Sequence, residues 1–66
     1  MRVDALHAAI SEAERFLRRC RAVEILTIVP DHGKPWDTVR DNTAESAACK
    51  RASLDLTMVL AELRKP

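Results

Sequence analysis

The apolar residues near the N-terminus recur at intervals that alternate between three and four. They are Val3, Leu6, Ile10, Ala13, Leu17 and Cys20. This spacing places them on one stripe of an α-helix, of the kind that packs at a shallow angle against a second helix. Arginines at positions 18, 19 and 21 suit the negative end of the helix dipole. The pattern predicts a helix over residues 3–25.

A second helix is predicted over residues 35–64. Its own apolar seam is Cys49, Ser53, Leu56, Leu60 and Leu63. Pro35 suits the first position of a helix, where its missing N–H is not needed. A later start near Asn42 is the alternative, because this cap-like residue is followed by Glu45 three positions on. Residues 29–34, with Pro30 and the single Gly33, are predicted to form the connecting loop.

The segment 23–29 has a different character from its surroundings. β-Branched residues dominate it, and such residues fit a pleated strand better than a helix. Two interpretations stay open at this point: a frayed extension of the first helix, or a short extended stretch. Pro30 ends the segment in either case, because a residue before proline is pushed out of the α region.

If the two helices fold back antiparallel about a turn near Lys34, facing residues have position numbers that add to about 69. Cys20 then faces Cys49, and the other seam residues pair in the same way. Helix axes 8–10 Å apart rarely bring Cα atoms within disulfide range. We therefore expect the two cysteines to be small, reduced seam residues, and a redox-sensitive staple is the alternative.

The second helix carries more apolar surface than one partner helix can cover. The excess residues are Ala47, Leu54, Met58, Val59 and Ala61. A chain of 66 residues buries only about 60% of its unfolded surface, so association is the natural source of further burial. The predicted fold class is all-α: an antiparallel helical hairpin that forms one domain and assembles as a homodimeric four-helix bundle.

Composition excludes several classes of protein. The formal charge of +1 gives no global attraction to nucleic acid or anionic membranes, and no apolar run reaches the roughly 18 residues that span a bilayer. The N-terminal segment is too polar for a signal peptide, so the cytoplasm is expected. His7 and His32 lack partners at metal-ligand spacing. We predict no catalytic residue, cofactor or metal, and no enzymatic activity.

Six cationic residues are expected at one level of the hairpin. This arginine patch consists of Arg15, Arg18, Arg19, Arg21, Lys50 and Arg51. It suggests an alternative function, a regulator that binds nucleic-acid phosphates. With a strand at 23–29 and a break near Lys50, the element order would resemble that of ribbon-helix-helix DNA-binding dimers. Residues 48–53 lack the turn residue that such a break requires, so this topology is not assigned.

Trp36 is the only tryptophan, and two roles are open to it. It can anchor a partner, because tryptophan is enriched at binding hot spots. It can instead cover the end of the helical hairpin by lying over Val29 or Val39. The function expected from the sequence is a small protein-interaction or regulatory module that pairs with itself or with another protein through helix packing.

Overall fold

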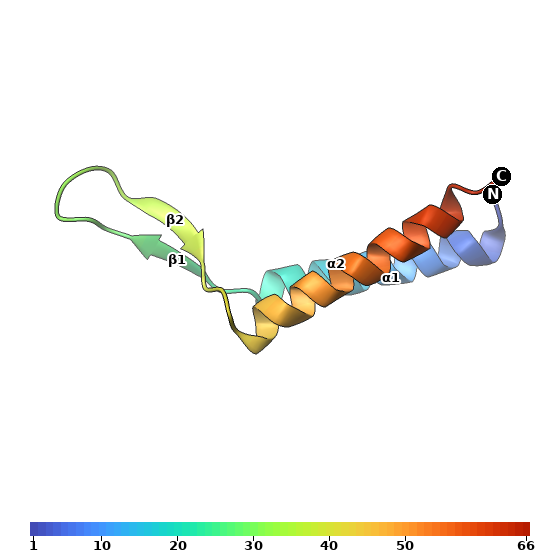
Figure 1. The fold of residues 1–66 in the computed structure, drawn as a ribbon, viewed down its shortest axis with the longest axis horizontal. Coiled ribbons are helices and arrows are strands. Elements are labelled where there is room, and N and C mark those ends of the chain that lie inside the picture. The colour runs from blue at the N-terminus through green and yellow to red at the C-terminus, as the bar shows by residue number, and fades with distance from the viewer.

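In the computed structural model, which describes all 66 residues, two long helices flank a two-stranded β-ribbon. Helix α1 spans Val3–Ala22, strand β1 Ile25–Ile28, strand β2 Trp36–Val39, and helix α2 Ala44–Leu63. The helices lie side by side and antiparallel, with both termini at one end (Figure 1). The ribbon projects from the other end, so the molecule measures 55 × 22 × 14 Å.

The fold is therefore not all-α, which corrects the predicted class. Both helices are shorter than expected: α1 ends at Ala22 and α2 begins at Ala44, nine residues after Pro35. The segment between them forms an antiparallel sheet, with Ile25 opposite Val39 and Ile28 opposite Trp36. The extended interpretation of residues 23–29 was the right one. The four-helix bundle is also wrong, since the structure contains two helices and a ribbon.

The residues of the ribbon explain why it leaves the helical path. Isoleucine and threonine make up three of the four residues of β1, and β2 contains Thr38 and Val39; their branched side chains favour a pleated backbone. The Thr27 hydroxyl donates to the Asp37 carboxylate across the strands at 2.8 Å. Gly33 has a φ of +103° in the loop, a conformation that glycine adopts without strain. Pro30 and Pro35 lie in the loop between the strands. Neither has a backbone N–H to donate to a neighbouring strand, so the strand pairing does not extend through them.

The start of α2 is fixed by a reciprocal cap. The Thr43 hydroxyl accepts from the backbone N–H of Ser46 at 3.1 Å, and the Ser46 hydroxyl accepts from the N–H of Thr43 at the same distance. Asn42, with a φ of 59°, turns the chain into this cap. The later start of the second helix is confirmed, but its capping residues are Thr43 and Ser46, one position beyond Asn42 and Glu45. Pro35 does not begin a helix, because residues 36–39 pair with β1 as a strand. The helix begins only after the cap at Thr43.

Replacing Thr43 with alanine should destabilise the fold by about 1 kcal/mol, since the backbone N–H of Ser46 loses its side-chain acceptor. Thr57→Ala is the matched control, because Thr57 is an exposed mid-helix threonine of the same helix. Alanine is the better helix former there, so its effect should be neutral or stabilising. Urea denaturation followed by circular dichroism measures both. Equal effects of the two substitutions would contradict the role of the cap.

The core is thin and lies between the helices. Only Ala9, Ala52 and Ser46 are buried, and Ala52 is 0% exposed. Alanines at the contact let helices approach closely, because the separation of helix axes depends on the side chains between them. Leu6, Ile10 and Leu17 of the predicted seam remain 40–48% exposed. Ile10 lies about 100° around the helix from the buried Ala9. Helix α1 therefore turns its alanine side towards α2 and leaves Leu6, Ile10 and Leu17, which we call the side stripe, at the edge of the helix contact.

Candidate functional site

The helix pair and the ribbon meet at a junction built around the two cysteines. Cys20 lies in the last turn of α1 and Cys49 in the second turn of α2. Their sulfur atoms are 3.3 Å apart and share a hydrogen bond. The position numbers add to 69, so the predicted register is confirmed at this level. Both cysteines are free thiols, in agreement with the expected reduced seam residues, and their side chains bring the two sulfur atoms within hydrogen-bond distance.

The environment of the thiols is partly open. Both cysteines are half-buried and lie at a hollow of about 300 Å³ where the ribbon leaves the helices. The hydrogen bond with Cys49, and secondarily partial desolvation, raises the pKa of Cys20 above that of a free thiol. The residues that line the hollow are Cys20, Val23, Val39, Asp41, Ser46, Cys49 and Lys50.

The connectors around this junction are held by polar contacts. Lys50 Nζ pairs with the Asp41 carboxylate at 3.1 Å. The backbone N–H of Asn42, followed by Lys50, lowers the pKa of Asp41 below its usual value. At the base of the ribbon, the N–H of Arg40 donates to the Glu24 carbonyl at 2.8 Å, and their side chains form an ion pair. The Lys50–Asp41 pair thus ties the connector after β2 to α2, and the Arg40–Glu24 contacts close the base of the ribbon.

One ion pair bridges the two helices at mid-length. Arg15 Nη1 lies 2.8 Å from Asp55 Oδ2 and 3.2 Å from Glu12 Oε2. Hydrogen bonds to Asp55 first and to Glu12 second raise the pKa of Arg15 further. Arg15 is therefore neutralised within the hairpin. Partial neutralisation of the arginine patch by nearby carboxylates, Glu12 and Asp55 among them, is expected from the sequence, and the structure assigns these two to Arg15.

The predicted arginine patch is consequently divided. Arg15 is bound by two carboxylates and Lys50 by Asp41. The remaining four members, Arg18, Arg19, Arg21 and Arg51, are exposed and make no salt bridge. Helix α2 runs unbroken through Lys50, so the strand–helix–helix order is not found. For the alternative function, nucleic-acid binding, these four arginines remain available, and no aromatic side chain lies among them.

The predicted interface residues occupy two places. Leu54 and Met58 are 67% and 70% exposed, and Ala47 and Ala61 are exposed along the same line of α2. We call these four residues the outer row. Leu54 lies two residues, about 200°, from the buried Ala52, so the row points away from α1. Val59 is set apart, half-buried between the helices.

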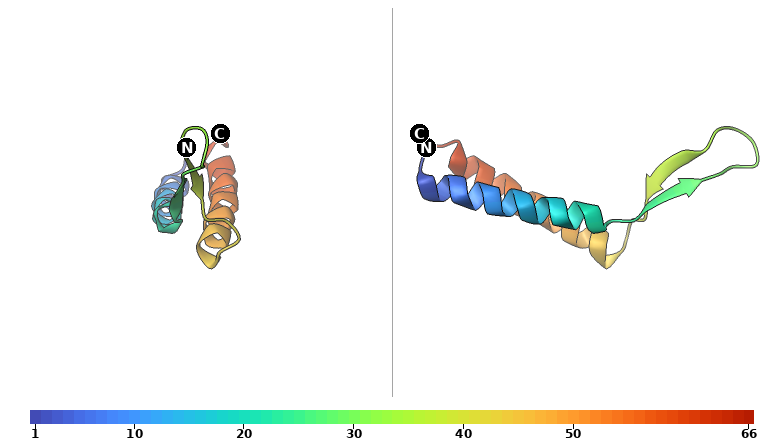
Figure 2. Two further views of the ribbon diagram at one scale, coloured as in Figure 1. Left: turned by 90° about the vertical axis from the view of Figure 1, so that its left-hand side faces the viewer. Right: turned by 180° about the vertical axis from the view of Figure 1, so that it is seen from behind.

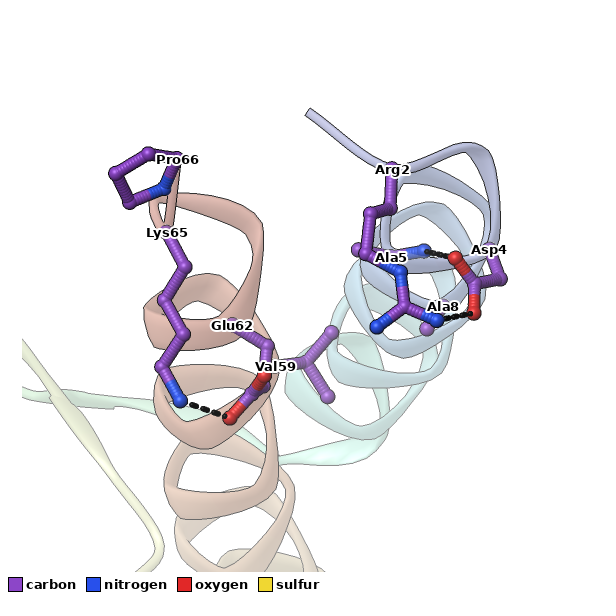
Figure 3. A pocket seen from close by; sticks show the side chains of 8 residues that line it. All are labelled: Arg2, Asp4, Ala5, Ala8, Val59, Glu62, Lys65 and Pro66. Carbon is purple, nitrogen blue, oxygen red and sulfur yellow. Dashed lines mark hydrogen bonds and ion pairs between the residues drawn. The ribbon is translucent and has the colours of Figure 1, made fainter.

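Val59 lines a second hollow, of about 360 Å³, at the end that carries both termini (Figure 3). Its charged groups neutralise one another in pairs: Arg2 with Asp4 at 3.0 Å, and Lys65 with Glu62 at 2.8 Å. Lys65 also lowers the pKa of Glu62. All four side chains are largely exposed, so the hollow is an open gap between helix ends and offers no built binding site.

Trp36 begins strand β2, opposite Ile28. The ribbon that carries it projects away from the helix pair (Figure 2). Trp36 is 53% exposed and does not cover the end of the hairpin, so that structural interpretation is wrong. Ile28 and Trp36 share one face of the ribbon with Leu26, because side chains two apart along a strand point to the same side. The role of Trp36 as a partner anchor stays a prediction.

The described side chains contain no cluster of three or more His, Cys, Asp or Glu residues that could hold a metal ion. Neither helix is long and apolar enough to cross a membrane. Comparisons with protein-family models, curated proteins and solved structures find no significant match to this chain. The candidate sites are therefore the junction thiols and the exposed apolar surfaces.

Proposed function

We propose that this chain is a non-enzymatic protein-interaction module of the cytoplasm that works as a homodimer. The observation that carries the proposal is its surface area. The chain exposes 5486 Å², whereas a compact monomer of 7.4 kDa exposes about 4,200 Å². Its radius of gyration is 16.4 Å, against about 11 Å for a compact chain of this length.

The excess of about 1,300 Å² is larger than the roughly 800 Å² that each partner contributes to a standard stable interface. Much of it is apolar. Large hydrophobic side chains are exposed on both helices and on both faces of the ribbon, among them Leu54, Met58 and Trp36. Monomeric proteins rarely leave so much apolar surface open, and the buried core here is too small to offset the entropy of folding alone.

The outer row of α2 is the proposed contact. A symmetric dimer places the same patch on both subunits, so an apolar row that is straight along one helix can meet its own copy. Because the row points away from α1, the second copy would lie on the far side of α2. Each α1 would then remain on the outside, in a flat layer, and the four helices would not share one core.

The cytoplasm is proposed because two cysteines are too few for a disulfide-stapled secreted scaffold, and small secreted domains commonly depend on such staples. An interaction module fits the shape of the molecule as well. The helix pair supplies a stiff base for association, while the ribbon carries apolar side chains away from it. A two-stranded ribbon alone is marginally stable, so its root at the helix ends matters.

The test of the proposal is the molar mass in solution. Light scattering after size-exclusion chromatography should give twice 7.4 kDa for the wild-type chain at micromolar concentration. On dilution, helicity measured by circular dichroism should fall together with the dimer, since association contributes to folding. A helical monomer that keeps its ellipticity over the whole dilution series would refute the proposal. A poorly folded monomer would refute self-association and indicate a different protein as partner.

A further inference from the structure

We propose that Cys20 and Cys49 are an oxidative modification site, at which a small-molecule disulfide converts the two thiols into a reversible intramolecular disulfide. The observation is the distance of 3.3 Å between the two sulfur atoms. A disulfide bond is about 2.05 Å long, so the sulfurs must approach by a little over 1 Å. Side-chain rotation supplies such a movement without displacing either helix.

The placement of the cysteines supports the proposal independently of the distance. Each stands on a long helix, in the last turn of α1 and the second turn of α2, and the two helices are held in register by the Arg15–Asp55 ion pair. The bond would therefore close a loop of about 30 residues that contains the whole ribbon. Cross-linking a loop of this size restricts the unfolded chain considerably.

Access to the thiols is provided by the hollow at the junction. Both cysteines line it and are half-buried, so a small reagent can reach them. The thiolate is the reactive form in such an exchange, so the raised pKa of Cys20 makes the reaction faster at alkaline pH.

The reaction consists of two exchanges. The thiolate of one cysteine attacks a sulfur atom of the reagent disulfide, which releases one reagent thiol and leaves a mixed disulfide on the protein. The second cysteine then loses its proton and attacks the protein sulfur of that mixed disulfide, which releases the second reagent thiol. The protein loses two electrons and two protons, and the reagent disulfide is reduced to two thiols. Added thiol reverses both steps.

The experiment is a redox titration of the full chain with oxidised and reduced glutathione. Mass spectrometry should show the loss of two hydrogens without a retained glutathione, and non-reducing electrophoresis should show no covalent dimer. The equilibrium constant for disulfide formation should be about 100-fold or more higher in the native protein than in urea, because the fold holds the thiols together. The melting temperature of the oxidised chain should rise by about 10 °C or more.

Cys20→Ser and Cys49→Ser, each checked for helicity, should stop at the mixed disulfide with glutathione. The proposal is overturned if the native protein forms only mixed or intermolecular disulfides. It is equally overturned if the equilibrium constant is no higher in the native protein than in urea, since the native geometry would then oppose the bond. Both readouts are independent of whether the chain dimerises through α2.

Discussion

Replacing Ala52 with leucine will lower the melting temperature of the protein by about 10 °C. Ala52 is 0% exposed and lies on the side of α2 that faces α1. Three added carbon atoms cannot be placed there without forcing the helices apart or the new side chain off its preferred rotamers. Such overpacking costs about 1–3 kcal/mol.

The expected loss is large relative to the total free energy of unfolding of the chain. Domains of this size rarely possess more than about 3–5 kcal/mol of stability. Moving the helices apart would also lengthen the Arg15–Asp55 contact and separate the two cysteine sulfurs, so one substitution weakens several interactions at once. Thermal unfolding followed by circular dichroism measures the change.

Ala47→Leu is the matched control. It makes the same substitution on the same helix at an exposed position, so the small difference in helix propensity between alanine and leucine cancels. Its melting temperature should change little, or rise if added apolar surface on the outer row strengthens association. If Ala47→Leu and Ala52→Leu proved equally harmful, the burial of Ala52 would not be the cause.

Introducing aspartate at both Leu54 and Met58 will weaken the proposed dimer by at least about 100-fold. In a symmetric contact each new carboxylate enters an apolar interface and approaches the same charge on the other copy. Both positions are two-thirds or more exposed within one chain, so the helix pair itself has no reason to reject the charges. Sedimentation equilibrium or light scattering over a dilution series gives the dissociation constant.

Thr57→Asp compared with Met58→Asp separates the interface from the helix. The two positions are adjacent on α2, both are exposed, and both receive the same residue. Thr57 lies about 100° away from the outer row, so its substitution should leave the dimer intact. A second pair, Ile10→Asp and Ser11→Asp, examines the side stripe of α1 in the same way. If only Ile10→Asp abolished the dimer, the dimer contact would lie on α1, and the proposal that the outer row forms it would be refuted.

The residues that decided the fold were only partly visible in the sequence pattern. The alternation of three and four between Val3 and Cys20 predicts α1, and its N-terminal bound is correct. The antiparallel register follows from where the chain turns, and it correctly places Cys20 opposite Cys49. Both results depend on local spacing and chain length, which the sequence contains in full.

The ribbon shows why local reasoning stops short. Residues 23–29 are β-branched, but a strand needs a partner, and the partner at residues 36–39 includes Asp37 and follows a proline that suits a helix start. Residues 36–39 become a strand only because they pair with residues 25–28 across the loop. That pairing also changes the register, because between Cys20–Cys49 and Ile25–Val39 the chain runs five residues on one side and ten on the other.

The sequence by itself thus determined that two helices would fold back on each other and that Cys20 would stand level with Cys49. The tertiary structure alone decided the rotation of α1, which buries Ala9 and leaves the larger Leu6, Ile10 and Leu17 partly exposed. It also decided the separation of the two thiols and the engagement of Arg15 by Asp55. These are properties of pairs of residues about 30 to 40 positions apart, and their distances depend on packing that no single segment specifies.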